Sequence, residues 1–206
     1  MKRSYFLIAL CAILFSLTGC KPTVKPSANP FIHVENGQFI RNGQPYYYVG
    51  TNFWYGAILG STGQGGDRER LAKELDYMKS IGIDNLRILV GADGERGVPA
   101  KVEPTLQVAP GVYNDTILRG LDYLMAEVGK RQMKAVLYFN NSWEWSGGYS
   151  AYLEWAGAGE APSPRNWKEF SAYNGSFVTN KKAREMAANT VRHIVSRVNT
   201  VTERPY

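Results

Sequence analysis

The sequence predicts an α/β fold built from about three strand–helix units of the (β/α)8 TIM-barrel type, preceded by a short β-hairpin. Three observations lead to this prediction. Apolar runs and amphipathic helical segments alternate along the chain, which favours parallel strands joined by right-handed crossovers. The loops after the strands are long and rich in polar and aromatic residues, whereas the loops after the helices are very short. That asymmetry is typical of a barrel whose binding site lies on the face reached by the strand-to-helix loops.

The first expected elements are short strands separated by tight turns. Residues 36–37 and 42–43 are both Asn-Gly, a dipeptide typical of two-residue hairpin turns. They divide this part of the chain into strands expected at 31–35, 38–41 and 46–49, and the last of these begins the parallel sheet.

Two further strands and three helices follow. Asp67 is a suitable N-cap for the first helix, and Gly82 is a suitable residue to end it. Apolar residues recur every three or four positions in each helical segment, which is the spacing of a buried face. The strands are expected at 85–90 and 134–139, and the helices at 68–81, 115–131 and 181–200. The predicted buried faces are Leu71, Leu75, Met78 and Ile81; Ile117, Leu121, Leu124 and Val128; and Met186, Val191, Ile194 and Val198.

The first residues predict export. Lys2 and Arg3 precede an apolar run over 5–17 that is too short for a stable membrane-spanning helix, which indicates a signal peptide. The run ends in L-T-G-C, which resembles the lipobox of bacterial lipoproteins and predicts lipidation of Cys20. An ordinary secretory signal with a chance cysteine is the alternative. We expect a lipoprotein signal peptide at 1–19, a proline-rich lipid-anchored tether at 20–30 and a folded domain at 31–206.

These signals predict an exported lipoprotein, held by its lipid at the outer membrane or cell surface of a Gram-negative bacterium. The membrane would be contacted through the lipid anchor, because multiple acyl chains give stable attachment.

Charge and histidine content argue against several other classes of protein. The net charge of +6 is scattered along the chain, whereas a nucleic-acid-binding protein would gather its basic residues on one face, so we expect no nucleic-acid partner. His33 and His193 are isolated and no cysteine cluster accompanies them, which predicts no metal site. A doubly wound nucleotide-binding sheet is the alternative α/β fold, but no G-x-G-x-x-G follows the first strand. We therefore expect no cofactor.

The segment at 140–148, N-N-S-W-E-W-S-G-G, is the strongest indication of function. It follows a predicted strand, so it lies where α/β folds place their binding sites. Indole faces stack on the C–H faces of sugar rings, while amides and carboxylates bind hydroxyl groups. The segment therefore predicts a carbohydrate site. The candidate substrate-binding residues are Trp54, Tyr55, Asn140, Trp143, Glu144 and Trp145; Trp155 and Trp167 are expected to pack beneath the loop.

Three segments resemble the family-five glycoside hydrolases, specifically the bacterial endo-β-1,4-mannanases. They are G-T-N-F-W-Y-G at 50–56, N-L-R-I-L at 85–89 and N-N-S-W-E-W-S-G-G-Y-S-A-Y-L-E-W at 140–155. The resemblance covers about residues 31–206. It implies a (β/α)8 fold, retaining hydrolysis of β-1,4-mannosidic bonds, and β-mannan or a related polysaccharide as the partner.

The resemblance also implies where the chemistry takes place. Retaining hydrolysis needs two carboxyl groups about 5–5.5 Å apart. In the family, the acid/base is the Glu of an Asn-Glu-Pro motif ending strand four, and the nucleophile is a Glu ending strand seven. Neither motif is present here, so both catalytic glutamates are expected beyond residue 206. We therefore expect 31–206 to be an incomplete catalytic domain, the N-terminal part of a barrel, and inactive alone.

No catalytic residue is predicted within the chain, but two supporting residues are. Arg87 matches the family's strand-two arginine that orients the nucleophilic carboxylate, and Asn141 matches an asparagine that lines the cleft. The alternatives are a structural ion pair for Arg87 and loop capping for Asn141. The Asn140–Asn141 doublet leaves the alignment open by one position, and Asn141 is the preferred match. Glu144 is expected to bind hydroxyl groups or to serve the loop rather than to catalyse.

Two other functions remain open from the sequence. The same fold could act on cellulose or another β-1,4-glycan. Alternatively, the chain could be a non-catalytic, membrane-tethered glycan-binding lipoprotein.

Overall fold

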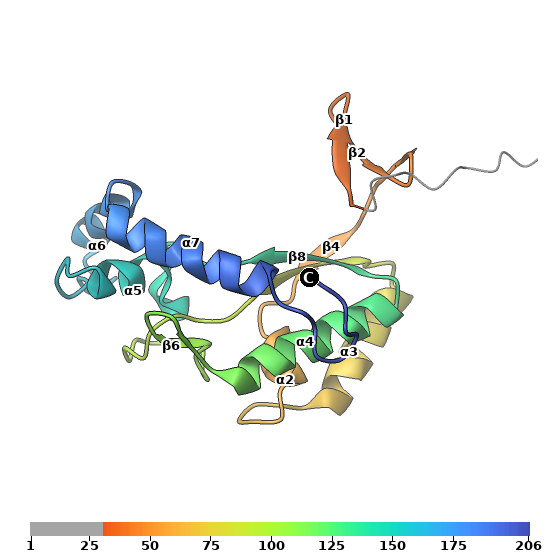
Figure 1. Cartoon of the computed structure of the whole chain (residues 1–206), viewed down its shortest axis with the longest axis horizontal. Coiled ribbons are helices and arrows are strands. Elements are labelled where there is room, and N and C mark those ends of the chain that lie inside the picture. Colours follow the sequence, from red (N-terminus) through yellow and green to blue (C-terminus); the bar gives the residue numbers. More distant parts are fainter. Residues whose placement is uncertain (1–30) are drawn as a thin grey trace, which may run out of the picture. The chain divides into compact units, whose positions relative to one another are not determined.

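The structure is a computed structural model that describes residues 31–206; the predicted signal peptide, Cys20 and the tether at 20–30 lie outside the described residues. The described residues fall into two units that divide between Tyr47 and Tyr48. Figure 1 shows the order of the elements along the chain.

The first unit is a three-stranded antiparallel sheet in which β2 lies between β1 and β3. Asn36 and Gly37 have φ values of 50° and 76°, and Asn42 and Gly43 have values of 52° and 73°. A type I′ turn requires positive φ at both central residues, so each Asn-Gly pair fits its turn. The predicted hairpin is confirmed, and a short third strand is added to it. The strands are β1 (His33–Glu35), β2 (Gln38–Arg41) and β3 (Gln44–Pro45).

The second unit is organised around a parallel sheet with the strand order β4-β5-β8. Gly50 pairs with Asn85, which in turn pairs with Lys134. The strands are β4 (Gly50–Asn52), β5 (Asn85–Leu89) and β8 (Lys134–Tyr138). The strand expected at 46–49 is wrong, because pairing with β5 starts only at Gly50. The predicted α/β fold with parallel strands is confirmed. The three strands form an open sheet, as in part of a barrel, and do not close into a complete barrel.

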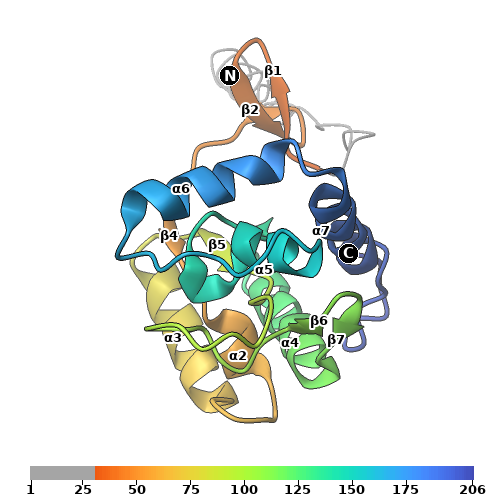
Figure 2. The ribbon, with the colours of Figure 1, turned by 90° about the vertical axis from the view of Figure 1, so that its left-hand side faces the viewer.

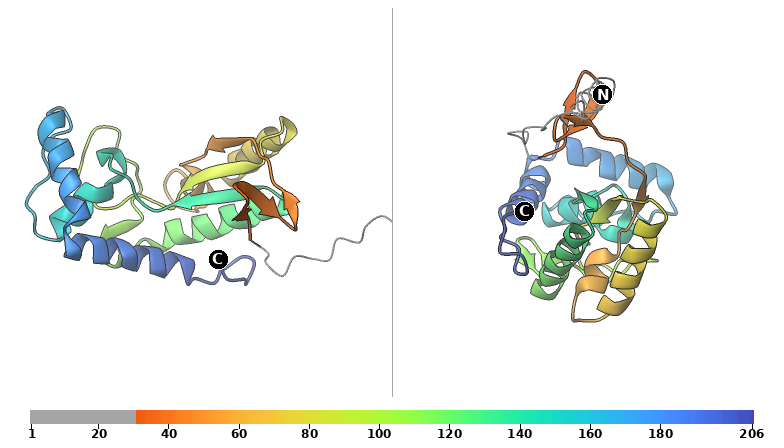
Figure 3. Two further views of the ribbon diagram at one scale, coloured as in Figure 1. Left: turned by 90° about the horizontal axis from the view of Figure 1, so that it is seen from above. Right: turned by 90° about the vertical axis from the view of Figure 1, so that its right-hand side faces the viewer.

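Helices α2 (Gly56–Gly60), α3 (Arg68–Ser80) and α4 (Asp115–Lys130) cover one face of this sheet, as Figures 1 and 3 show. Leu86 and Ile88 of β5 point into this layer and are fully buried. The other members of this core include Leu71, Leu75, Ile117, Leu121, Leu124 and Val128, which the helical spacing predicted. Ile81 is the exception on α3, because the helix ends at Ser80 and leaves it 55% exposed.

Glycines allow α2 and α4 to approach each other closely. A Cβ atom at Gly60 would lie 2.4 Å from the Gly120 carbonyl oxygen, and one at Gly120 would lie 2.2 Å from that of Ala57. Any larger residue at either position would push the two helices apart.

Side-chain caps fix where the three long helices begin. Asp67 Oδ1 accepts from the Arg70 backbone N–H at 2.8 Å, which confirms the predicted N-cap of α3. Asn114 and Asn180 cap α4 and α7 (Lys181–Val195) in the same way, at 3.0 Å in each case. Each cap satisfies a backbone donor that has no partner within its helix.

Helix α7 is shorter than the sequence predicts, and its predicted buried face is confirmed in part. Ile194 is fully buried and Met186 packs against a core cluster, whereas α7 ends at Val195 and Val198 is 57% exposed. The helix does not continue beyond Val195, because the residues that follow form hydrogen bonds with the side chain of Asp122 on α4. Arg197, Thr200 and Tyr206 donate to its carboxylate at 2.9, 2.8 and 2.6 Å. The buried residues of α7 are Ala183, Ala187, Thr190 and Ile194.

Both long loops contain structure of their own. The loop after β5 carries a hairpin, and the segment after β8, expected to be a loop, contains two short α-helices. These helices are held in place by three side chains that are at most 1% exposed: Tyr152, Leu153 and Phe170. These elements lie on the left-hand side of the unit in Figure 1, and Figure 2 looks onto that side. They are β6 (Gln107–Ala109), β7 (Val112–Tyr113), η2 (Glu144–Ser146), α5 (Gly148–Trp155), α6 (Trp167–Gly175) and η3 (Ser176–Val178).

Within residues 31–206, none of the helices is both long enough and apolar enough to cross a membrane.

Candidate functional site

The face of the sheet opposite the helices carries Arg87. The side chain is exposed at the centre of β5 and lies beside Asn52 of β4 in the strand register. Arg87 Nη1 donates to Asn52 Oδ1 at 3.3 Å, and the guanidinium carbon lies 3.6 Å from the centre of the Tyr138 ring. Burial raises the pKa of the Tyr138 hydroxyl, and the Arg87 cation limits that rise.

The Asn52 amide and the Tyr138 ring therefore hold the Arg87 side chain. The alternative from the sequence was a structural ion pair. A guanidinium has five donors arranged as a planar fork that matches a carboxylate. Stacking on Tyr138 fixes the plane of that fork, so the group can orient an anion placed over the open face. The role of Arg87 toward a nucleophilic carboxylate stays a prediction.

Asn141 organises the loop that follows β8. Its Oδ1 accepts from the Trp143 backbone N–H at 2.7 Å and from Ser146 Oγ at 3.1 Å. Its carbonyl oxygen accepts from the Tyr149 N–H at 3.0 Å. Gly148 has a φ of 53°, and a Cβ there would lie 2.1 Å from this carbonyl oxygen. The structure thus shows the loop-capping alternative for Asn141, and its place in a cleft stays a prediction.

The loops after β4 and β8 meet through their tryptophans. The Trp54 and Trp145 ring centres are 6.1 Å apart, with the planes at 63° in an edge-to-face contact. Trp54 is 41% exposed, while Trp145 packs against the small apolar cluster formed by Leu89, Ala92 and Val102. The structure therefore brings together two candidate sugar-binding residues that are distant in the sequence.

Tyr55 lies edge-on against Trp54, with ring centres 5.3 Å apart and planes at 79°. The Tyr55 hydroxyl donates to Glu74 Oε2 on α3 at 2.8 Å, so the polar end of this side chain is bound to α3. Asn140 lines an open groove of about 650 Å³ with Tyr149, Phe177 and residues of α7. Substrate binding by either residue stays a prediction.

Trp143 and Trp167 form a second aromatic contact, with ring centres 5.5 Å apart and planes at 30°. Trp143 is 49% exposed and Trp167 is 55% exposed. The expectation that Trp167 packs beneath the loop is therefore wrong, because its position at the start of α6 leaves the ring at the surface. Trp155 does pack inward, edge-on against buried Tyr152.

Glu144 lines a partly open cavity of about 100 Å³ between the two long loops, together with Asp93 and Lys101. Within residues 31–206, its Oε2 atom is buried without a hydrogen-bond partner, and so is Asp93 Oδ2. Lys101 Nζ donates to the Asp93 carbonyl oxygen at 2.7 Å. A cavity of this size with polar walls can hold ordered water.

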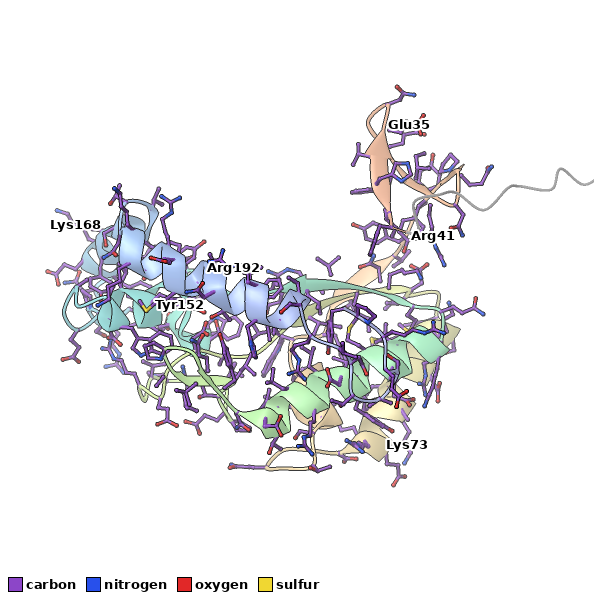
Figure 4. All side chains as sticks on the ribbon, viewed as in Figure 1. Glu35, Arg41, Lys73, Tyr152, Lys168 and Arg192 are labelled. Atoms are coloured by element: carbon purple, nitrogen blue, oxygen red, sulfur yellow. The ribbon has the colours of Figure 1, made fainter. Side chains whose placement is uncertain are left out.

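Asp93 is almost completely buried, with 2% of its surface exposed. Desolvation raises the pKa of its carboxyl to about 8, while the Tyr152 hydrogen bond and the Lys101 charge act in the opposite direction. Tyr152, labelled in Figure 4, donates to Asp93 Oδ1 at 3.1 Å. Near neutral pH the carboxyl therefore carries a proton for a large part of the time.

Residues 29–206 match the family described as GH family 5 beta-mannosidase-like. The chain belongs to this family. It is 27% identical over 213 residues to mannan endo-1,4-beta-mannosidase 5 of Solanum lycopersicum, covering 98% of this chain and 47% of that protein. The chain therefore spans about half the length of the curated relatives it matches.

Solved structures of the same family have the same fold. The family 5 mannosidase of Rhizomucor miehei is 31% identical and has a TM-score of 0.80, with 86% of this chain and 45% of that one covered. A mutant of that mannosidase, in complex with mannosyl-fructose, is 32% identical, also with a TM-score of 0.80 and with 86% and 45% of the two chains covered. The family and fold predicted from the sequence are confirmed.

Asp93 is not among the site residues predicted from the sequence. It lies in the loop directly after β5, at the same end of the sheet as the tryptophan segment. That strand-end position was the available signal. Among residues 31–206 no cluster of three or more His, Cys, Asp and Glu side chains could hold a metal ion.

Proposed function

We propose that this family 5 chain forms the mannan-binding part of a retaining endo-1,4-β-mannosidase. The contact between Trp54 and Trp145 carries the proposal, because it joins aromatic rings from two strand-end loops beside the open face of the sheet. Indole rings in such a position offer the flat apolar faces on which sugar rings stack. Curated relatives named as mannan endo-1,4-beta-mannosidases and a relative in complex with mannosyl-fructose support mannose units as the ligand.

The proposed division of labour places binding and orientation in this chain and bond cleavage elsewhere. Arg87 offers its guanidinium on the open face, where it would orient and keep ionised a nucleophilic carboxylate. The acid/base and nucleophile glutamates would come from sequence beyond residue 206. This assignment is supported by the lack of an Asn-Glu-Pro motif in residues 1–206.

Binding and hydrolysis by the chain test this proposal separately. Electrophoresis through gels containing β-mannan or hydroxyethyl cellulose measures binding, and release of reducing ends from each polymer measures hydrolysis. We expect retardation by β-mannan that Trp54→Ala and Trp145→Ala weaken, without release of reducing ends. Tyr77→Ala, which removes a 66% exposed ring from α3, is the matched control.

The other outcomes separate the alternatives. Retardation by cellulose alone would indicate a different β-1,4-glycan as the substrate class. Release of reducing ends by the chain would overturn the assignment of the glutamates. Co-expression with the following region of a family 5 relative, without any gain of hydrolysis, would favour a glycan-binding lipoprotein.

We also propose that Cys20 carries lipid and holds the protein at the outer membrane or cell surface. The L-T-G-C sequence at 17–20 and the preceding apolar run support this. Radiolabelled palmitate should enter the wild-type protein and not Cys20→Ser, and the variant should move from the membrane to the soluble fraction. Equal labelling of both proteins would contradict the proposal, and Cys11→Ser serves as the control.

A further inference from the structure

Trp143 and Trp167 place two large apolar rings in contact at the surface. They come from different elements, Trp143 from the loop after β8 and Trp167 from the first residue of α6. The two residues are 49% and 55% exposed, and their ring centres are 5.5 Å apart. Neighbouring exposed aromatic rings are uncommon on a soluble protein surface and mark a place where something binds.

The Trp143 backbone and the Trp167 ring are both anchored, although the two residues are half exposed. Asn141 Oδ1 accepts from the Trp143 backbone N–H at 2.7 Å. The Trp167 ring packs against Phe170, which is 1% exposed, with ring centres 6.1 Å apart. A ligand that stacks on Trp167 therefore has less side-chain disorder to remove, which favours affinity.

A direct hydrogen bond ties the two elements together. Asn174 of α6 is 5% exposed, and its Nδ2 donates to the Ser142 carbonyl oxygen at 2.9 Å. The bond fixes the start of the tryptophan loop against α6. The spacing of the two rings is thus set by the protein before any ligand arrives.

The residues next to the two tryptophans in the sequence are polar. Ser142 precedes Trp143, Asn166 and Lys168 adjoin Trp167, and all three are exposed. The Asn166 side chain forms no cap hydrogen bond at the start of α6. Lys168 is labelled in Figure 4 on α6. An apolar helix or peptide would leave these groups poorly paired, whereas a pyranose ring offers both a C–H face and hydroxyl groups.

We propose that Trp143 and Trp167 together form an additional sugar-binding platform, which holds one pyranose ring of a β-mannan chain. Trp167 is the new member and would extend the binding surface beyond the pair formed by Trp54 and Trp145. The proposal rests on the proposed function for its substrate class. The stacking itself requires only a sugar with an exposed C–H face.

Substitution of Trp167 tests this proposal in the full chain. Binding of mannohexaose and of soluble β-mannan would be measured by calorimetry and by affinity electrophoresis. We expect Trp167→Ala and Trp167→Leu to weaken both by about 3- to 10-fold, from the usual worth of one aromatic contact. Trp167→Phe should retain most of the affinity. Leu keeps an apolar contact with Phe170, so it separates loss of the stacking face from loss of packing.

The control is Tyr77→Ala, which should bind as the wild type does. Unchanged affinity in Trp167→Leu would overturn the platform, and so would failure of the wild-type chain to bind any β-glycan. Binding of a different β-glycan that still depends on Trp167 would overturn the mannan assignment in the proposed function while supporting the platform. Mannan binding without dependence on Trp167 would overturn only the platform.

Discussion

The Tyr152 hydroxyl of α5 donates to Asp93 Oδ1 at 3.1 Å, across a site where both residues are at most 2% exposed. The Gln107 amide completes the network when its nitrogen faces Tyr152, Thr190 and Asp93, and its oxygen then accepts from the Gly111 N–H at 2.8 Å. The loop after β5, the segment after β8 and α7 therefore meet at one buried polar centre. Rearrangement of any one of them would leave buried polar groups without partners.

The buried Asp93 carboxyl predicts a stability that falls as pH rises. Its pKa is raised to about 8 in the folded protein, whereas an unfolded aspartate has a pKa of about 3.9. Between these values the folded state holds a proton that the unfolded state has lost. The free energy of unfolding should then decrease by about 1.4 kcal/mol per pH unit, and this loss should level off below about pH 4 and above about pH 8.

Urea unfolding between pH 5 and 8 would measure this dependence in the wild type and in Asp93→Asn. The variant should lack this contribution and gain stability over the wild type as pH rises. Asp115→Asn, at an exposed carboxylate paired with Arg119, should keep the slope of the wild type. Equal slopes in Asp93→Asn and the wild type would contradict the prediction.

Asp122→Ala should strongly destabilise the protein. Its carboxylate is 0% exposed and accepts from Arg197, Thr200 and Tyr206. Removing it leaves a largely buried guanidinium without its counter-charge, which typically costs about 3–5 kcal/mol. Urea unfolding and faster proteolysis after α7 would report the loss.

The matched control is Asp76→Ala, which removes a 67% exposed carboxylate from Arg131. An exposed ion pair is worth at most about 1 kcal/mol. Similar losses in the two variants would show that Asp122 does not anchor the segment after α7.

Gly147→Ala should separate the two long loops. Gly147 has a φ of 79°, and a Cβ there would lie 1.8 Å from the Asp93 carbonyl oxygen. Backbone strain of this kind costs about 1–3 kcal/mol before the steric contact is counted. Thermal unfolding should show the loss, and the tryptophan emission should shift as the loop moves. Gly97→Ala, where a Cβ meets nothing within 4 Å, should change neither measurement.

Arg87→Met should leave stability within about 1 kcal/mol of the wild type, because the side chain is exposed and forms one hydrogen bond of 3.3 Å. The pKa of Tyr138 should rise further once the neighbouring cation is gone. NMR titration of the Tyr138 ring would measure the shift. Arg131→Met, which removes bonds to Asp76 and Glu127, should cost more stability and leave that pKa unchanged.

Local signals explain what could be predicted from the sequence. The cap at Asp67 and the apolar spacing of α3 and α4 depend on residues within a few positions of each other, so the helices are visible in the chain itself. The end of α7 depends on Asp122, which lies 75 positions before Arg197. No local pattern reports such a contact. The same distinction applies to the candidate site. Its tryptophans could be predicted, because they form a motif in the sequence.

The partners of those site residues were not visible. The Tyr55 hydroxyl donates to Glu74, and the Trp167 ring contacts Trp143, because separate elements pack together. Asp93 looked like a surface carboxylate because its burial comes from α5 and α7, which supply Tyr152 and Thr190. The two short helices after β8 were missed because side-chain caps do not mark their starts.

The alternation along β5 has an evolutionary consequence. Leu86 and Ile88 are constrained by the volume available beneath the sheet, whereas Arg87 between them is constrained only by what lies over the open face. Point substitutions at Arg87 would therefore change the chemistry of the open face without repacking the helices. A one-residue insertion or deletion within Asn85–Leu89 would exchange the two sets at once. We expect the fold of this strand to accommodate a substitution at Arg87 and to reject any change in the length of the strand.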